Sequence, residues 1–155
     1  MTIRCEIVSQ DRLVFEGDAD IVIIPGANGE MGILPNHAPL LSTMVMGVIK
    51  VRFSGQEEVF TITGGVVEVQ PDLVIVLADA AEDVEEIDIA RAEEAKKRAE
   101  ELLSQGPPAE DLDAYLTLEA ALRRSNLRLE AVRRYRSGRR RLPQMERPPD
   151  QRESN

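Results

Sequence analysis

The hydrophobic pattern of this chain changes its period once, near Asp88. Before that residue, short apolar segments alternate with polar residues, as in Ile49, Val51 and Phe53, and a period of two is typical of a half-buried β-strand. After it, apolar residues recur at intervals of three and four, which is the period of an α-helix. The sequence therefore predicts a β-rich unit followed by a helical unit, an α+β fold.

The first unit covers residues 1–86, and turn residues divide it into short segments. Their spacing is typical of a small antiparallel β-sandwich, and we expect seven or more strands. The segment from Leu73 to Leu77 is apolar at every position, which predicts a strand buried between two layers. The turn residues are Gly17, Pro25, Gly26, Gly29, Gly32, Pro35, Gly47, Gly55, Gly64, Gly65 and Pro71.

The second unit, residues 87–137, predicts two helices joined by a short loop at Gly106-Pro107-Pro108, which makes an antiparallel hairpin. The stripes that would face one another are narrow and rich in small residues such as Ala92 and Ser125. Because burial contributes about 25 cal/mol per Å² of apolar surface, we expect the hairpin to be held weakly and to detach and straighten. Residues 138–155 are rich in proline and polar residues and predict a disordered tail.

The net charge of −9 is divided unevenly between the two units. Residues 1–86 hold 4 basic and 15 acidic side chains, whereas residues 87–155 hold 15 and 13. Nine arginines lie in the segment 123–141 with a single acid, Glu130. This segment predicts an anionic partner, and the simpler alternative is a solvated helix face followed by a solubilising tail.

Composition excludes several classes of protein. The chain has no apolar stretch of roughly 18 residues, so we expect an unexported, soluble protein with no direct membrane insertion. The single cysteine, Cys5, excludes an intramolecular disulfide, and with so few thiols we expect no metal site. Cys5 alternates with Ile3 and Ile7, which favours a small buried residue over a reactive thiol.

No catalytic constellation is recognisable, so we predict that the chain is not an enzyme. His37 is the only histidine, and no spacing places a nucleophile and an orienting acid beside it. The glycines at 26, 29 and 32 lack the lysine and hydroxyl residues of a phosphate loop, and strands flank them. A nucleic-acid-binding module is disfavoured because the first 86 residues carry a net charge of −11.

Three segments resemble ATP synthase epsilon subunits, in the order expected for that family. The first is Pro25-Gly26-Ala27-Asn28-Gly29-Glu30-Met31-Gly32-Ile33-Leu34-Pro35-Asn36-His37-Ala38-Pro39-Leu40-Leu41. The second is Gly64-Gly65-Val66-Val67-Glu68-Val69, and the third runs from Val74-Ile75-Val76-Leu77-Ala78-Asp79 to Ile87-Asp88-Ile89-Ala90-Arg91-Ala92. The resemblance extends from the first predicted strand to about Arg136.

The resemblance implies a central-stalk subunit that couples proton-driven rotation to ATP synthesis, located peripherally on the cytoplasmic face of the cell membrane. The sandwich would contact the gamma subunit and the ring of c subunits, with His37 on the surface facing gamma, Ser42 at a subunit interface and Glu30 facing the c-subunit loops. The simpler alternative for His37 is a hydrogen bond within its own turn. The hairpin would inhibit ATP hydrolysis when it extends toward the catalytic alpha and beta subunits. No cofactor is required in this family.

The helices also predict an anion site. Arg91 and Arg98 are seven residues apart, and Arg124 and Arg128 are four apart, so each pair shares a helical face. Guanidinium groups that converge from two packed helices would repel one another without an anion between them.

The resemblance implies that this anion is ATP, a regulatory ligand that also contacts Glu82, Ile87 and Asp88. Two alternatives stay open. Asp88 is a good N-cap, and capping alone would explain it. The chain could also be a freestanding ATP-sensing protein that binds ATP without a gamma subunit.

Overall fold

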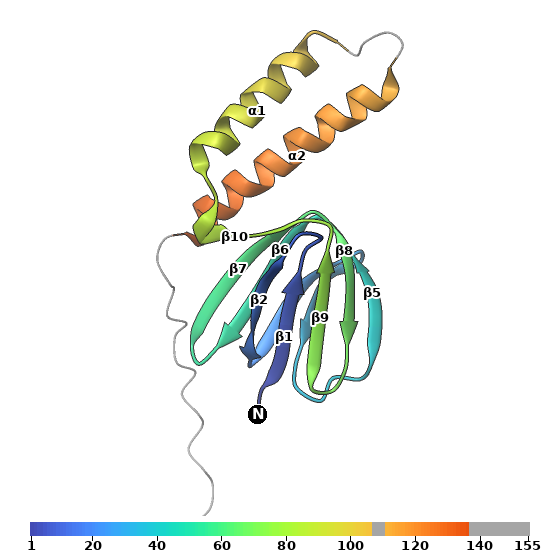
Figure 1. The fold of residues 1–155 in the computed structure, drawn as a ribbon, viewed down its shortest axis with the longest axis vertical. Coiled ribbons are helices and arrows are strands. Elements are labelled where there is room, and N and C mark those ends of the chain that lie inside the picture. Colours follow the sequence, from blue (N-terminus) through green and yellow to red (C-terminus); the bar gives the residue numbers. More distant parts are fainter. Residues whose placement is uncertain (107–110, 137–155) are drawn as a thin grey trace, which may run out of the picture.

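A computed structural model describes residues 1–106 and 111–136 (Figure 1). This part of the chain contains ten strands, one short 3₁₀ helix and two α-helices. The strands are β1 (Ile3–Val8), β2 (Leu13–Ala19), β3 (Ile21–Gly26), β4 (Gly29–Ile33), β5 (Leu40–Met44), β6 (Gly47–Phe53), β7 (Gln56–Ile62), β8 (Gly65–Val69), β9 (Leu73–Ala78) and β10 (Ala81–Asp83). The helices are η1 (Val84–Glu86), α1 (Ile89–Ser104) and α2 (Leu112–Tyr135). The predicted α+β class is confirmed.

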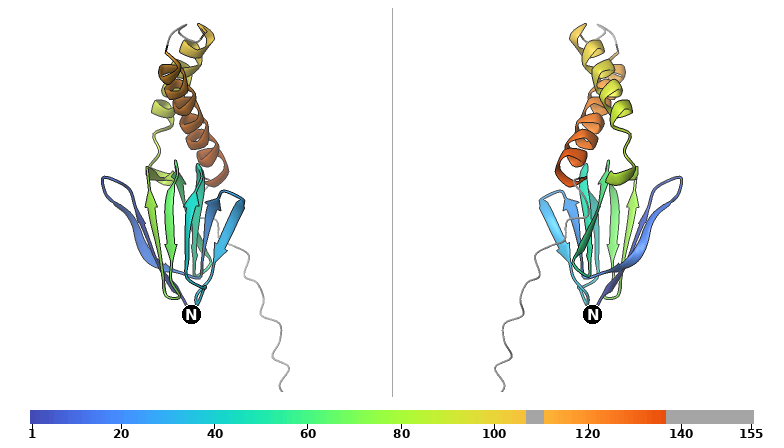
Figure 2. Two further views of the ribbon diagram at one scale, coloured as in Figure 1. Left: turned by 90° about the vertical axis from the view of Figure 1, so that its right-hand side faces the viewer. Right: turned by 90° about the vertical axis from the view of Figure 1, so that its left-hand side faces the viewer.

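All ten strands belong to one hydrogen-bonded network in the order β10-β7-β6-β3-β5-β8-β9-β1-β2, with β4 paired to β3. The network folds over into the two layers of a sandwich (Figure 2). One pair departs from the antiparallel arrangement expected from the sequence, because β1 and β9 run parallel. Alternation within a strand reports which face is buried but not which strand lies beside it, so the sequence could not show this pair.

The core lies between the two layers and consists of side chains from nearly every strand. Phe60 is 1% exposed, and Ile3, Ile62 and Val74 are fully buried. Cys5 belongs to the same cluster, as expected, and burial raises the pKa of its thiol to about 12. The sandwich therefore has a core of its own, without any side chain from the helices.

The strand at Leu73–Ala78 corrects one prediction. Its residues alternate between buried and less buried, and Leu77 is 52% exposed, so β9 is not enclosed between two layers. Sequence composition alone suggested burial on both faces, but the outer face of β5, β8 and β9 carries apolar side chains that remain exposed. Apolar composition therefore did not place the outer face of β9 in the core.

The helices form the predicted antiparallel hairpin, which stands on one end of the sandwich (Figure 2). Asp88 caps α1, since its Oδ1 accepts a hydrogen bond of 3.0 Å from the Arg91 N–H. In the described part of the two helices the buried side chains are small, namely Ala92, Ala99 and Ser125, with Ala131 packed against the sandwich. The expected alanine and serine between the helices are therefore present at Ala92, Ala99 and Ser125. The predicted loop prolines and the disordered tail from 138 lie outside the described residues.

A small second cluster joins the hairpin to the sandwich. It consists of Val59 of β7, Val84 of η1, Ile87 and Ala131 of α2, each no more than 7% exposed. We call these four residues the latch. Arg136 reinforces it by donating hydrogen bonds to the carbonyls of Glu85 (2.8 Å) and Ile87 (2.5 Å). Among the described residues, the buried apolar cluster that joins the two units therefore lies at the base of the hairpin.

Candidate functional site

A pocket of about 200 Å³ lies above the latch, where the hairpin meets the end of the sandwich. We call it the junction pocket. Its walls come from the β1–β2 turn, β7, β10 and α2. The lining residues are Arg12, Thr61, Thr63, Ala80, Ala81, Glu82, Arg124, Leu127 and Arg128.

Strand register and helical spacing place the polar residues of this pocket. Glu82 pairs with Thr61 across β10 and β7, and the Thr61 hydroxyl lies 3.5 Å from the Glu82 carbonyl, to which it donates. Arg124 and Arg128 are one turn apart on α2, so both reach the same wall. The Arg128 Nε donates to the Glu82 carboxylate at 2.8 Å, which ties α2 to β10.

The junction pocket carries an excess of positive charge. Three arginines line it, and Glu82 is the only carboxylate among the lining residues. Arg12 also forms an ion pair of 3.3 Å with Glu86 in η1, whereas Arg124 makes no ion pair with any acid in the described part of the chain. Guanidinium groups and threonine hydroxyls suit phosphate oxygens, so the pocket can hold an anion.

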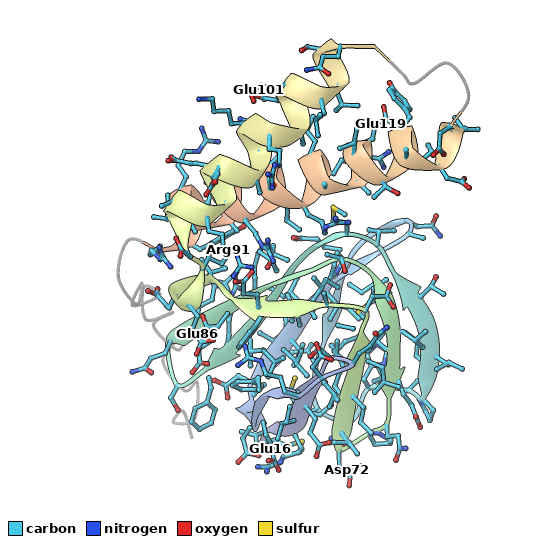
Figure 3. The ribbon with its side chains drawn as sticks, turned by 45° about the horizontal axis from the view of Figure 1, so that its top comes forward. Glu16, Asp72, Glu86, Arg91, Glu101 and Glu119 are labelled. Carbon is cyan, nitrogen blue, oxygen red and sulfur yellow. The ribbon has the colours of Figure 1, made fainter. Side chains whose placement is uncertain are left out.

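Three of the seven residues predicted for the ATP site meet in this pocket, namely Glu82, Arg124 and Arg128. Ile87 is instead buried in the latch, and the Asp88 carboxylate caps α1. Arg91 and Arg98 are exposed side chains of α1 outside the pocket lining, and Figure 3 shows Arg91 in the first turn of α1 above the sandwich.

The sequence analysis did not identify three polar residues of the pocket. Thr61 and Thr63 had a usable signal, because they alternate with Phe60 and Ile62 and therefore face away from the core. No sequence signal pointed to Arg12, because it lies in a turn whose position against the hairpin depends on the whole topology.

The residues predicted for subunit interfaces lie in two separate places. Glu30 follows the β3–β4 turn, at the hairpin end of the sandwich, and its carboxylate accepts a hydrogen bond of 3.1 Å from Lys50. His37 lies in the loop after β4, where its Nδ1 is 2.7 Å from the Ala38 carbonyl. That loop is joined to the β8–β9 turn by a hydrogen bond of 2.7 Å from Asn36 to Pro71.

The apolar outer face of β5, β8 and β9 extends between these two places. Leu41, Val66 and Leu77 are 72%, 37% and 52% exposed. Val66 and Leu77 are register partners, so their side chains lie side by side on one face. Ser42 of β5 neighbours Leu41 but points to the opposite face, where its hydroxyl donates to the Thr43 carbonyl at 3.3 Å.

Comparison with known families divides the chain where the structure does. The ATP synthase delta/epsilon chain beta-sandwich domain matches residues 2–84, and the long alpha-helix domain of the same chain matches residues 85–133. This chain belongs to the ATP synthase delta/epsilon family. The resemblance found in the sequence is thereby confirmed.

Curated relatives agree over nearly their whole length. The ATP synthase epsilon chain of Dehalococcoides mccartyi strain BAV1 is 45% identical over 134 residues, which cover 86% of this chain and 94% of the relative. The epsilon chain of Moorella thermoacetica is 43% identical over 132 residues, which cover 84% and 96%. The chain is thus an epsilon chain of the bacterial type.

Solved structures confirm the fold. A chain of the Euglena gracilis mitochondrial ATP synthase, in a structure of OSCP, F1 and the c-ring, matches with a TM-score of 0.68 at 24% identity. The match covers 84% of this chain and 80% of the Euglena chain.

None of the helices in the described residues is long and apolar enough to cross a membrane. Epsilon chains are non-catalytic subunits of the synthase, in agreement with the prediction that this chain is not an enzyme.

Proposed function

We propose that this epsilon chain is a central-stalk subunit that couples proton-driven rotation to ATP synthesis and inhibits ATP hydrolysis through its hairpin, with ATP as an effector. The observation that carries the proposal is the contrast between a sandwich with its own core and a hairpin joined to it by the four-residue latch and a few polar contacts. One part is built to stay docked and the other to detach. The assembled protein lies peripherally on the cytoplasmic face of the cell membrane.

The sandwich docks through two surfaces. The apolar outer face around Leu41, Val66 and Leu77 suits the gamma subunit, with His37 at its far end, because exposed apolar patches on a folded domain mark protein contacts. Glu30 suits polar loops of the c ring, since its side chain is 58% exposed. Lys50 connects that carboxylate to the hairpin, because its ammonium group also lies 5.8 Å from the ring centre of Tyr135 in α2.

Docking is tested by replacing Leu77 with aspartate and measuring co-elution of the full chain with gamma. A charge in the centre of an apolar contact is costly to desolvate, so we expect Leu77→Asp to abolish co-elution. Leu13→Asp is the matched control, because Leu13 is equally exposed at 52% but lies on β2. Equal binding by both variants would assign the gamma contact to another surface.

The hairpin acts as a brake on hydrolysis when it leaves the sandwich. Detachment breaks the latch and the ion pair between Arg128 and Glu82, and it frees the arginines of α2. Basic side chains along one helix then attract acidic segments of the catalytic alpha and beta subunits, an attraction that salt weakens.

ATP binds in the junction pocket and favours the docked hairpin. The pocket exists only where α2 meets β7 and β10, so a ligand that contacts both walls binds the docked state more tightly than the extended one. Its phosphates would contact Arg12, Arg124 and Arg128. ATP would therefore relieve the inhibition.

Isothermal titration of ATP into the full chain tests this site. We expect Arg124→Ala to weaken ATP binding about tenfold or more, the usual effect of losing a charge-assisted contact. Arg123→Ala is the matched control, because Arg123 is adjacent on α2 but lies outside the pocket and pairs with Glu119 at 3.8 Å. If ATP bound tightly to a chain that failed to co-elute with gamma, the freestanding sensor would be the better account.

A further inference from the structure

A second cavity, of about 280 Å³, opens at the edge of the sandwich where β2 faces the β6–β7 hairpin. We call it the core mouth. The cavity is lined by Phe15, Glu16, Gly17, Asp18, Val51, Phe53, Gln56 and Glu58. None of these residues belongs to the junction pocket or to the apolar outer face, so the proposed function leaves the core mouth unexplained.

The core mouth combines an apolar floor with an acidic rim. Phe15 stacks against the core residue Phe60 at 5.4 Å between ring centres, and Phe53 is left 45% exposed. Gly17 keeps the cavity open, because a Cβ at that position would lie 2.9 Å from the Phe15 ring.

The rim carboxylates are only partly neutralised. Glu16 and Asp18 share a single arginine, Arg4, and the pKa of that guanidinium is raised by its hydrogen bond to Glu16. Glu58 makes no ion pair with any basic residue in the described part of the chain. The rim therefore keeps a negative charge beside exposed aromatic rings, which suits arginine side chains accompanied by apolar ones.

The chain itself contains a segment of this composition directly after α2. Residues 137–145 read Ser-Gly-Arg-Arg-Arg-Leu-Pro-Gln-Met, with three arginines, two large apolar residues and no acid. We infer that this segment docks in the core mouth of the same molecule, with Arg139–Arg141 at the rim carboxylates and Leu142 over the aromatic floor.

The length of the segment is sufficient for this contact. Arg136 is held at η1, which directly follows β10, and Asp83 of β10 is the register partner of Phe60. Gln56 at the core mouth lies four residues before Phe60 on β7, a distance of about 13 Å at ~3.3 Å per residue. From Arg136 to Leu142 an extended chain spans up to about 20 Å.

Docking of this segment would be a second tie between the end of α2 and the sandwich, separate from the latch. Figure 1 shows α2 ending beside β10, and Figure 3 shows Glu16 on the sandwich well away from the hairpin. The segment would thus run from the base of the hairpin down the open side of β7, where β10 covers only Phe60–Ile62. Because the tie is largely electrostatic, salt should release it.

A tryptophan reporter tests the inference, since the chain has no tryptophan of its own. Phe53→Trp is introduced into the full chain, with and without the triple change Arg139→Ser, Arg140→Ser and Arg141→Ser. We expect iodide quenching of the tryptophan to rise at least twofold in the triple variant, and 0.5 M salt to produce the same rise in the parent. Arg147→Ser with Arg152→Ser is the control, which should leave quenching unchanged.

A charge reversal makes the test independent of the reporter. In the full chain with Phe53 intact, we expect Glu58→Lys to abolish the backbone amide shift that the triple arginine change causes at Gln56. Glu68→Lys, an exposed change on β8, should preserve it. Equal quenching in the parent and the triple variant would overturn the inference, as would protection that depends on protein concentration, because the segment would then occupy a second copy.

Discussion

The sandwich and the hairpin of this chain are stabilised in different ways. The sandwich buries large side chains such as Phe60, Ile3 and Ile62 between its layers, whereas the buried side chains in the described part of the two helices are three alanines and a serine. Because burial of apolar area is the main favourable contribution to folding, the sandwich can be stable alone. The hairpin depends on the latch and on a few polar contacts. Under the proposed function, this difference would let the sandwich stay docked while the hairpin detaches.

The largest loss of stability is expected from a substitution in the sandwich core. Phe60→Ala deletes a ring that is 1% exposed, so it should reduce the free energy of unfolding by about 4 kcal/mol. Urea denaturation followed by far-UV circular dichroism measures the loss. Phe53→Ala is the control, because the Phe53 ring is 45% exposed and its removal should cost much less. Similar losses in both variants would contradict the assigned core.

A charged side chain introduced into the latch should detach the hairpin from the sandwich. Ala131 is 2% exposed against β7 and η1, so Ala131→Asp should cost about 3 kcal/mol at the hairpin–sandwich contact. Amide hydrogen exchange should then accelerate throughout α1 and α2 while the sandwich keeps its protection. Leu116→Asp places the same charge at a residue that is 48% exposed and should leave the exchange rates unchanged. Loss of protection in the sandwich would show that the two units unfold together.

Burial of Cys5 should also be visible in the pH dependence of the stability of the sandwich. The folded pKa of Cys5 is about 12, above its ordinary value of 9.0, so the unfolded chain releases this proton first. The stabilisation is complete below pH 9 and is lost as the pH rises toward 12, about 1.4 kcal/mol per pH unit. Comparison with Cys5→Ala isolates this contribution in urea denaturation at pH 8 and pH 10. Parallel profiles for the two proteins would place Cys5 outside the core.

The ion pair between Arg128 and Glu82 should contribute less to the free energy that holds the hairpin on the sandwich. Their side chains are 43% and 29% exposed, and partly exposed pairs contribute about 0.5–1 kcal/mol. A double-mutant cycle with Arg128→Gln and Glu82→Gln, measured by hairpin hydrogen exchange, gives the coupling energy. A second cycle with Lys97→Gln and Glu101→Gln, an exposed pair within α1, is the control and should give a smaller value. Additive effects of Arg128→Gln and Glu82→Gln would mean that the pair does not hold the hairpin.

The smallest expected effect concerns the pKa of a tyrosine in the hairpin. The pKa of Tyr115 is raised by the nearby Glu119 carboxylate. Glu119→Gln should return it toward its ordinary value, and 1 M salt should do so in the parent chain because salt screens exposed charges. A spectroscopic titration in a Tyr135→Phe background isolates the Tyr115 signal. Insensitivity of the titration to both changes would require another cause for the shift.

Much of the fold could be predicted because it depends on local patterns. The change of period near Asp88 located the division between strands and helices, and the N-cap at Asp88 followed from residue type. The parallel pairing of β1 with β9 could not be predicted, since it depends on which strands the folded chain brings together. The exposure of Leu77 could not be predicted either, because apolar composition does not distinguish a buried face from an exposed one.

The candidate site was predictable to the extent that it lies within one element. Arg124 and Arg128 share the pocket wall because they are four residues apart on α2. Arg12 belongs to the same pocket through tertiary contact alone. Arg91 lies outside the pocket because no residue of α1 lines it, and helical period does not show which helix will face the sandwich.

The central claim is that the sandwich is the dock and the hairpin the brake. ATP hydrolysis by the cognate catalytic head without its epsilon subunit tests it most directly, after addition of either the full chain or a chain ending at Glu86, with co-elution checked for both. The shorter chain keeps every buried residue of the sandwich core. The account predicts that both co-elute and that only the full chain slows hydrolysis. Equal slowing by the shorter chain, or failure of both to co-elute, would contradict it.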